Sequence, residues 1–278
     1  MKKAIFTISL AFVSLLVSAQ HYYKDILVIK AANQKHKLYH QHKVNSITFA
    51  SFDGEGQPIE GFTSGQNFNK DFTEVVTRSS NTLSGASVST SWFNSSDQLI
   101  KTQDTAEGVK TITTYAYNAS NQIVRINNTT TSAGDFSIRE VHEWTYNDQG
   151  KPLKMLKIKN GKDSTFVEFV MDEKGNLAEE KSTLKGRALP AVYYYYDDSN
   201  NLTDIVRYNS VAKRLLPDYV FEYDENNRLG SMLVVPEEGS DYQKWYYSYD
   251  EDGLKILDAC YSKSKVLIGR VEYRYIFN

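Results

Sequence analysis

Residues 193–202 read YYYYDDSNNL, in which four consecutive tyrosines precede two aspartates and a run of small polar residues. An aspartate side chain can accept a hydrogen bond from the backbone two residues further on, which starts a tight turn. Asn200 follows Asp197 by three residues, and asparagine tolerates the left-handed backbone conformation better than most residues. We interpret the stretch as the end of a strand followed by a hairpin turn.

The same pattern recurs along the chain, with a period of about 26 residues from Phe93 onward. A self-similar unit of this length indicates a repeat architecture. Because an Asp or Asn opens each turn and a Gly, Asn or Asp follows three residues later, we predict that each unit is a β-hairpin. A final half-unit, EYRYIFN, ends the chain in the same phase. The other matching stretches are FDGEGQP (52–58), FNSSDQL (93–99), YNASNQI (117–123), YNDQGKP (146–152), MDEKGNL (171–177), YDENNRL (223–229) and YDEDGLK (249–255).

Alternation along the strands predicts one aromatic face. Tyr194 and Tyr196 point to the same side of a strand, because side chains in a strand alternate between its two faces. Residues in the same phase in the other units are mostly aromatic, and stacked units therefore form an aromatic ladder. Further ladder positions are Tyr115, Tyr117, Trp144, Tyr146, Phe169, Tyr219, Phe221, Tyr223, Trp245, Tyr247, Tyr249, Tyr273 and Tyr275.

The composition is typical of strands, with 20 Tyr and 13 Phe beside only 5 Pro. No long stretch after residue 20 shows a convincing helical period. We predict an all-β fold of repeated antiparallel β-hairpins in one long curled or twisted sheet, a partial or closed shell. Residues 20–278 form a single β-hairpin repeat domain, with an irregular first part at 20–90 and regular repeats at 91–278.

The unit resembles the RHS or YD repeat of secreted bacterial proteins, whose signature is a tyrosine-aspartate turn that ends in Gly-Arg-Leu or a variant. YDENNRL and MDEKGNL carry the resemblance best, and it covers roughly residues 45–278. In that family, hairpins add edge to edge into a long curled sheet, which in large toxins encloses a cargo. The resemblance therefore implies a hairpin sheet. The enclosing function is not carried over, because eight units look too few to enclose anything.

The first 19 residues have the three parts of a secretory signal peptide: a charged start at Lys2 and Lys3, an apolar run, and a small-residue cleavage site. The apolar run is too short for a membrane-spanning helix. We therefore predict export to the periplasm, the cell surface or the medium. The single cysteine, Cys260, excludes an intrachain disulfide. A net charge of −2 and a pI near 6.2 indicate no nucleic-acid partner.

Three tyrosines interrupt an otherwise polar opposite face of the sheet. Tyr193 and Tyr195 project there, and Tyr246 lies in the corresponding phase two units on. Exposed aromatic residues can bind a sugar ring or a partner protein. We predict a ligand-binding site at these three residues, with a glycan or an envelope protein as the partner. The alternative is that they pack beneath a loop or a curled part of the sheet.

Two other stretches that resemble metal sites have simpler structural interpretations. His36, His40 and His42 have a spacing that suits a metal, yet no cysteine or carboxylate completes a site in that stretch, so we favour a solvated strand or turn. The acidic stretch 249–253 lacks the alternating ligands of an EF-hand loop and is interpreted as a turn. We expect no metal and no cofactor. No nucleophile motif or phosphate-binding glycine loop is present.

These observations favour an exported, non-catalytic protein with a binding or structural role at the cell envelope. One alternative is an outer-membrane β-barrel, suggested by the closing YRYIF and the many tyrosines, although the candidate lipid face carries few aliphatic residues. A second alternative is a carbohydrate-active enzyme, because the many carboxylates allow a glycosidase pair. The oligomeric state stays open.

Overall fold

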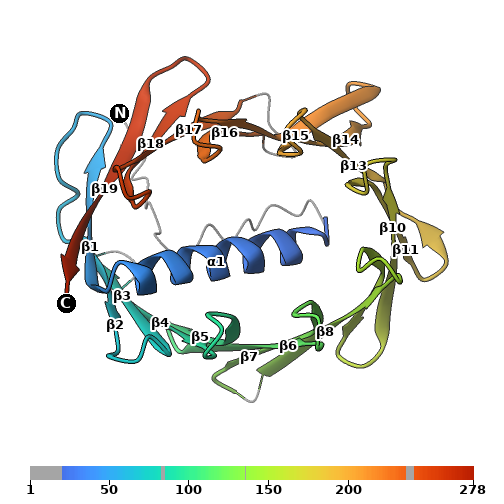
Figure 1. Ribbon diagram of the computed structural model, residues 1–278, viewed down its shortest axis with the longest axis horizontal. Helices are drawn as coiled ribbons and strands as arrows, with labels where there is room; N and C mark the ends of the chain where they lie inside the picture. Colours follow the sequence, from blue (N-terminus) through green and yellow to red (C-terminus); the bar gives the residue numbers. More distant parts are fainter. Residues whose placement is uncertain (1–20, 83–84, 135, 236–240) are drawn as a thin grey trace.

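The computed structural model describes residues 21–82, 85–134, 136–235 and 241–278. The predicted signal peptide, residues 1–19, lies outside the described residues. Of the 19 strands in these described ranges, 18 pair with their neighbours in antiparallel order, and β1 pairs with both β2 and β19, which closes the sheet into a barrel. The short strand β12 extends β11 at one rim. The all-β hairpin fold is confirmed, and the sheet forms a closed shell (Figure 1).

Among the described residues, one helix precedes the strands, namely α1 (Lys24–Gln41). The strands are β1 (Val44–Asp53), β2 (Thr63–Phe68), β3 (Glu74–Asn81), β4 (Gly85–Phe93), β5 (Leu99–Ala106), β6 (Val109–Tyr117), β7 (Ile123–Ser132), β8 (Phe136–Tyr146), β9 (Pro152–Lys159), β10 (Asp163–Met171), β11 (Leu177–Leu184), β12 (Arg187–Ala188), β13 (Val192–Tyr196), β14 (Leu202–Asn209), β15 (Arg214–Tyr223), β16 (Leu229–Val234), β17 (Gln243–Tyr249), β18 (Lys255–Ser262) and β19 (Leu267–Phe277).

The predicted turn chemistry is confirmed. In the turn after β13, the Asp197 carboxylate accepts hydrogen bonds from the backbone N–H groups of Ser199 (2.9 Å) and Asn201 (2.8 Å). Asn200 has a φ of 62°, in the left-handed region. The equivalent residue of every predicted unit also has a positive φ. These residues are Gly56, Asp97, Asn121, Gly150, Gly175, Asn200, Asn227 and Gly253.

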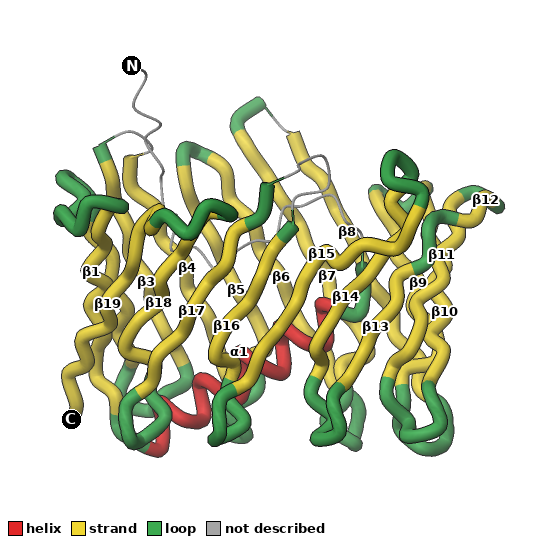
Figure 2. The backbone as a smooth tube through the Cα atoms, turned by 90° about the horizontal axis from the view of Figure 1, so that it is seen from above, coloured by secondary structure: helices red, strands yellow, loops and turns green. Residues whose placement is uncertain are grey.

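The first predicted unit is out of phase with the others. Its turn after Phe52 has the expected geometry, with the Asp53 carboxylate 2.8 Å from the Gln57 backbone nitrogen. However, β1 runs from the rim that holds the chain's C-terminus to the opposite rim, so this turn lies opposite the other turns (Figure 2). Phe52 pairs with Arg270 and lies outside the aromatic ladder.

The turn between Phe68 and Glu74 is in phase with the later units. The sequence pattern missed this turn. Asn69 opens this turn and accepts a hydrogen bond from the Glu74 backbone nitrogen at 2.9 Å. Its left-handed position is held by Phe72, with a φ of 53°, instead of Gly or Asn. A bulky residue rarely adopts this conformation. Phe72 is buried against the helix, and its ring stacks on that of His40, 4.5 Å between centroids.

The last tyrosine of each strand links neighbouring hairpins. Its hydroxyl donates a hydrogen bond to the backbone carbonyl of the first residue of the strand that precedes it in the chain. Tyr146, for example, donates to the Ile123 carbonyl at 2.6 Å. This contact explains why most units have tyrosine here, although Phe93 and Met171 occupy the position without a hydroxyl. Equivalent pairs are Tyr117–Leu99, Tyr223–Leu202, Tyr249–Leu229 and Tyr275–Lys255.

Replacement of Tyr146 by phenylalanine is expected to lower the free energy of unfolding by about 1 kcal/mol, the usual contribution of one hydrogen bond. The ring keeps its packing, so only the hydroxyl is lost. Urea unfolding monitored by circular dichroism measures the difference. Met171→Leu is the control, because this site has no hydroxyl to lose. A Tyr146→Phe variant as stable as the control would contradict a stabilising role for these contacts.

Helix α1 lies inside the barrel, along the longer dimension of the flattened ring (Figure 1). The expectation of no helix was therefore wrong, and so was the interpretation of the 36–42 histidines as a solvated strand or turn. Ile29, Ala32, His36 and Tyr39 are the buried residues of the helix. Their spacing is helical, but the pattern was weak in the sequence because one buried position is alanine and another is histidine.

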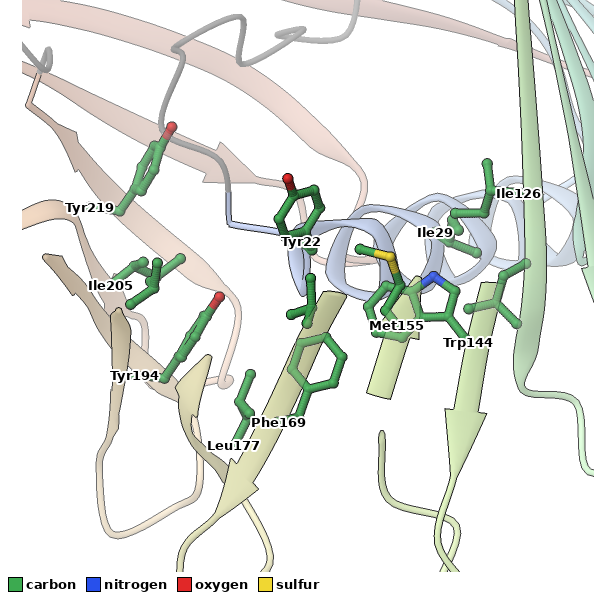
Figure 3. Packing of buried hydrophobic residues seen from close by; sticks show 13 residues of the cluster. Tyr22, Ile29, Ile126, Trp144, Met155, Phe169, Leu177, Tyr194, Ile205 and Tyr219 are labelled. Carbon is green, nitrogen blue, oxygen red and sulfur yellow. The ribbon is translucent and has the colours of Figure 1, made fainter. Parts of the chain in front are cut away.

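The predicted aromatic face lines the inside of the barrel and packs around α1. Tyr22 and Ile29 belong to one buried cluster with Trp144, Phe169 and Tyr194 of the wall (Figure 3). A second cluster surrounds Ala32 and Tyr39 near the other end of the helix. The expectation that the units enclose nothing was wrong, because 18 strands form a ring wide enough to surround a helix.

Candidate functional site

A groove on the outer wall contains two of the three predicted ligand-binding residues. It has a volume of about 620 Å³ and lies where β10, β11 and β13 meet the turns at the rim that holds the C-terminus. Tyr193 and Tyr195 line it, with Val170 and Ala178 on the neighbouring strands. The other lining residues are Asp172, Glu173, Lys174, Asn176, Glu179, Tyr194, Tyr196 and Asp197.

Strand register explains why the two tyrosines face outward. Tyr194 is buried in the barrel core at 3% exposure, so its neighbours in the chain project from the opposite face. Tyr195 is 48% exposed, and Tyr193 is half-buried between Glu179 on β11 and Val206 on β14. The alternation in the sequence placed both residues correctly.

Tyr246 is not part of this groove. It lies on β17, four strand spacings from β13, which corresponds to about 19 Å along the sheet. Its ring is 44% exposed and packs edge-on against Tyr261, 5.6 Å between centroids. Lys244 lies above the same ring at 5.2 Å. The structure therefore brings together two of the three predicted residues.

The groove combines aromatic rings with carboxylates. Glu179 lines the groove and forms an ion pair with Lys181 at 3.0 Å. Asp172 and Asp197 lie at its rim end, where each holds its own turn. Hydrogen bonds from Asn201 and Ser199 lower the pKa of Asp197, so it is ionised at neutral pH. An open, acidic and aromatic groove suits a ligand with hydroxyl or ammonium groups and a flat apolar face.

The two turns that border the groove are tied together. The Asn176 side chain donates to the Asn200 side chain at 3.0 Å, which links the turn after β10 to the turn after β13. The same position in the next turn, Asn201, reaches Asn227 at 2.6 Å. The first of these links joins the two turns that border the groove.

Glu180, next to the groove residue Glu179, points inward and holds the start of α1. It is 1% exposed and accepts hydrogen bonds from the backbone nitrogens of Tyr22 (2.8 Å) and Tyr23 (3.0 Å). The Tyr194 hydroxyl donates to the same carboxylate at 2.9 Å. A carboxylate is favourable at a helix N-terminus, where unpaired N–H groups carry partial positive charge. The sequence signal was a carboxylate at a position, nine residues after the start of the turn pattern, that other units fill with the buried residues Met155 and Ile205.

Two further contacts fix α1 to the wall. Near the helix start, His142 of β8 lies 2.5 Å from Asp25 and 3.0 Å from Glu140. Burial alone would lower the pKa of His142, but the hydrogen bonds that its ring donates to these carboxylates outweigh burial and raise the pKa to about 9. The imidazolium therefore bridges helix and wall at neutral pH.

The histidine stretch 36–42 packs against the wall. Asp97, a turn residue, lies 3.0 Å from His36 and 2.9 Å from His40. The His36 ring stacks on Phe93, 3.6 Å between centroids. His42 lies 4.0 Å from Asp252, in another turn. In the part of the chain that the structure describes, no group of three or more His, Cys, Asp or Glu side chains is placed to hold a metal ion.

No protein-family model matches the chain, and no curated protein matches it. Solved structures show distant similarity. A porin-like protein from Bacteroides uniformis has a TM-score of 0.42 at 10% identity, over 84% of this chain and 97% of that one. A porin-like protein from Bacteroides vulgatus has a TM-score of 0.25 at 12% identity, over 84% and 98% of the chains.

A chain of the Photorhabdus luminescens Tc holotoxin pore has a TM-score of 0.34 at 16% identity and covers 77% of this chain. The present chain spans only 12% of the length of that toxin chain. TM-scores and identities this low do not define a shared fold, and nothing about function follows from them. None of the helices among the described residues is both long and apolar enough to cross a membrane.

Proposed function

We propose that the protein is an exported, non-catalytic binding protein of the cell envelope, and that it presents its ligand site on the outer wall of a water-exposed barrel. The observation that carries the proposal is the groove at Tyr193 and Tyr195. Two outward tyrosines lie there beside carboxylates. The other aromatic residues of their strand belong to the core, with Tyr194 buried in it and Tyr196 packed against it.

Charges on the outer wall support a barrel that faces water. Ion pairs join Arg125 to Glu143 at 2.7 Å and Lys244 to Glu222 at 2.8 Å, on different parts of the wall. Similar pairs lie on β9 and β10, on β11 and on β19. A lysine or arginine on the lipid face of a membrane barrel costs about 2–4 kcal/mol at the bilayer midplane. An outer-membrane barrel with these lysine and arginine residues on its lipid face would carry this free-energy cost several times.

The alternative is an outer-membrane β-barrel, which the even number of strands in the closed ring favours. Extraction of the envelope with alkaline carbonate separates the two proposals. The protein is expected in the soluble fraction, with no heat-modified migration in gels. Retention in the pellet, together with heat-modified migration, would overturn the water-exposed barrel and support the outer-membrane alternative.

A glycan is the ligand class that best fits the groove. Tyrosine rings stack on the apolar face of a sugar, and carboxylate and amide oxygens accept hydrogen bonds from its hydroxyls. Glu179, Asp172 and Asn176 supply such acceptors within the groove. The groove is open along the wall, which suits an extended oligosaccharide more than a small enclosed molecule.

The double variant Tyr193→Ser, Tyr195→Ser is expected to weaken oligosaccharide binding about 5- to 150-fold, because each of the two aromatic contacts contributes about 0.5–1.5 kcal/mol. Isothermal titration calorimetry against a panel of envelope-derived oligosaccharides measures the loss. The melting temperature should stay nearly unchanged, since both rings project from the outer face.

Tyr246→Ser is the matched control, because it also removes an outward tyrosine but lies outside the groove. It should bind as the unmodified protein does. If stability collapses in the double variant, the tyrosines are part of the core and the binding proposal fails. If the control loses binding equally, the ligand contacts another part of the wall. Product release from the oligosaccharides would support the enzyme alternative instead.

A further inference from the structure

The two rims of the barrel differ in charge. The rim with the short turns is acidic, with twelve carboxylate residues against four basic residues in its eight turns. The acidic residues are Asp71, Asp97, Asp148, Asp172, Glu173, Asp197, Asp198, Asp224, Glu225, Asp250, Glu251 and Asp252. The basic residues are Lys70, Lys151, Lys174 and Arg228.

Part of the opposite rim is basic. Three successive hairpin ends, between β9 and β10, β11 and β13, and β14 and β15, lie side by side there (Figure 2). We call them the basic tips, and they comprise residues 159–163, 185–188 and 209–214. The single acidic residue in these segments is Asp163. Their basic residues, all exposed, are Lys159, Lys162, Lys185, Arg187, Lys213 and Arg214.

Apolar side chains project beside these charges. Val211 is 91% exposed at the end of its hairpin, where the Asn209 side chain accepts hydrogen bonds from the backbone of residues 211 and 212 and fixes the turn. Tyr208 and Leu215 pair across the same hairpin and are 53% and 45% exposed. A polar residue would be expected at such a turn. At the other end of the basic tips, the hairpin between β7 and β8 adds Phe136, which is 54% exposed.

We propose that the basic tips dock the barrel on the surface of an anionic phospholipid bilayer. Lysine and arginine near an anionic lipid surface each strengthen binding, and exposed apolar side chains enter the boundary between headgroups and acyl chains. A soluble polyanion would pair with the charges but leave Val211 in water. The presence of basic and exposed apolar side chains on one rim therefore favours a bilayer over a soluble polyanion as the partner.

Docking in this way sets the orientation of the barrel. The acidic rim points away from the bilayer, which avoids repulsion between its carboxylates and the lipid phosphates. The groove lies at the acidic end of the wall, since Asp172 and Asp197 belong to acidic-rim turns. It therefore stays open to solvent while the opposite rim is docked. The inference does not depend on the identity of the groove ligand.

Binding is tested by co-sedimentation of the purified protein with vesicles of phosphatidylcholine, with and without a third of phosphatidylglycerol. We expect binding only to the anionic vesicles, and release at high salt because screening weakens the attraction. Lys162→Ser with Lys213→Ser should weaken it roughly 30-fold, since each basic residue contributes about fivefold. Val211→Ser should weaken it severalfold.

The control is Lys70→Ser with Lys154→Ser, which changes the net charge equally but lies on the acidic rim and the outer wall. It should change binding less than twofold. Equal losses in both double variants, or equal binding to neutral vesicles, would overturn the proposal. So would equally tight binding to heparin that Val211→Ser leaves unchanged, because the partner would then be a soluble polyanion.

A fluorescent label reports the docked rim directly. Cys260 is fully buried, so a thiol-reactive dye labels an introduced cysteine selectively. A dye on Val211→Cys should shift its emission to the blue when anionic vesicles are added, and a dye on Asp198→Cys at the acidic rim should not. The reverse pattern would refute the orientation. Resistance to carbonate extraction would instead refute the water-exposed barrel, so the two failures are distinguishable.

Discussion

Replacement of Glu180 by leucine is expected to lower the free energy of unfolding by about 4 kcal/mol. The change leaves three donors without this acceptor: the buried backbone nitrogen of Tyr22, the buried Tyr194 hydroxyl and the partly buried backbone nitrogen of Tyr23. Each buried donor that loses its partner costs about 1–3 kcal/mol. Urea unfolding measures the loss, and limited proteolysis should show earlier cleavage in residues 21–43 as the start of α1 leaves the wall.

The adjacent residue provides the control. Glu179 lies on the outer face of the same strand, and Glu179→Gln removes a surface ion pair with Lys181, which typically contributes 0–1 kcal/mol. If Glu180→Leu and Glu179→Gln have equal stability, the inward carboxylate does not anchor α1.

The amide variant Glu180→Gln should fall between these two. Burial raises the pKa of Glu180, although hydrogen bonds from Tyr22, Tyr23 and Tyr194 oppose the shift. Because the folded pKa is raised, the stability contributed by this group is full below the unfolded pKa and declines as the pH rises through the folded pKa. Glutamine keeps one acceptor and has no charge to desolvate. Its deficit relative to the unmodified protein should therefore be smallest at alkaline pH.

Replacement of Trp144 by alanine is expected to cost about 4 kcal/mol, in the range for large aromatic residues in a core. Trp144 is 3% exposed, and its ring stacks on Phe169 with 5.1 Å between centroids (Figure 3). The wall is rigid here because β8 is paired with both β7 and β9, so it cannot collapse into the space left by the indole. Thermal and urea unfolding measure the effect.

Trp144→Phe should be much milder. The indole nitrogen is buried without a hydrogen-bond partner among the described residues, and its removal offsets part of the lost contact area. Thr145→Ala is the control, because Thr145 is exposed on the outer face of the same strand. Equal losses in the phenylalanine and alanine variants would show that the indole nitrogen is satisfied in solution.

The candidate site was only partly visible in the sequence. Alternation placed Tyr193 and Tyr195 on the outer face because it depends on one strand alone. The groove itself is formed with Val170 and Ala178 of neighbouring strands, and this arrangement depends on register between units. The sequence does not show which strands form the groove, so phase alone grouped Tyr246 with Tyr193 and Tyr195, although Tyr246 lies outside the groove.

The sequence by itself determined the hairpins, because each turn is specified by an Asp or Asn and by a residue that accepts a left-handed backbone. It also determined the aromatic face, because alternation is a local property. Tertiary structure decided that the sheet closes, since the β1–β19 pairing depends on curvature summed over all units. It also decided that 24–41 is helical: the aromatic interior and Glu180 stabilise a segment whose own apolar pattern is weak.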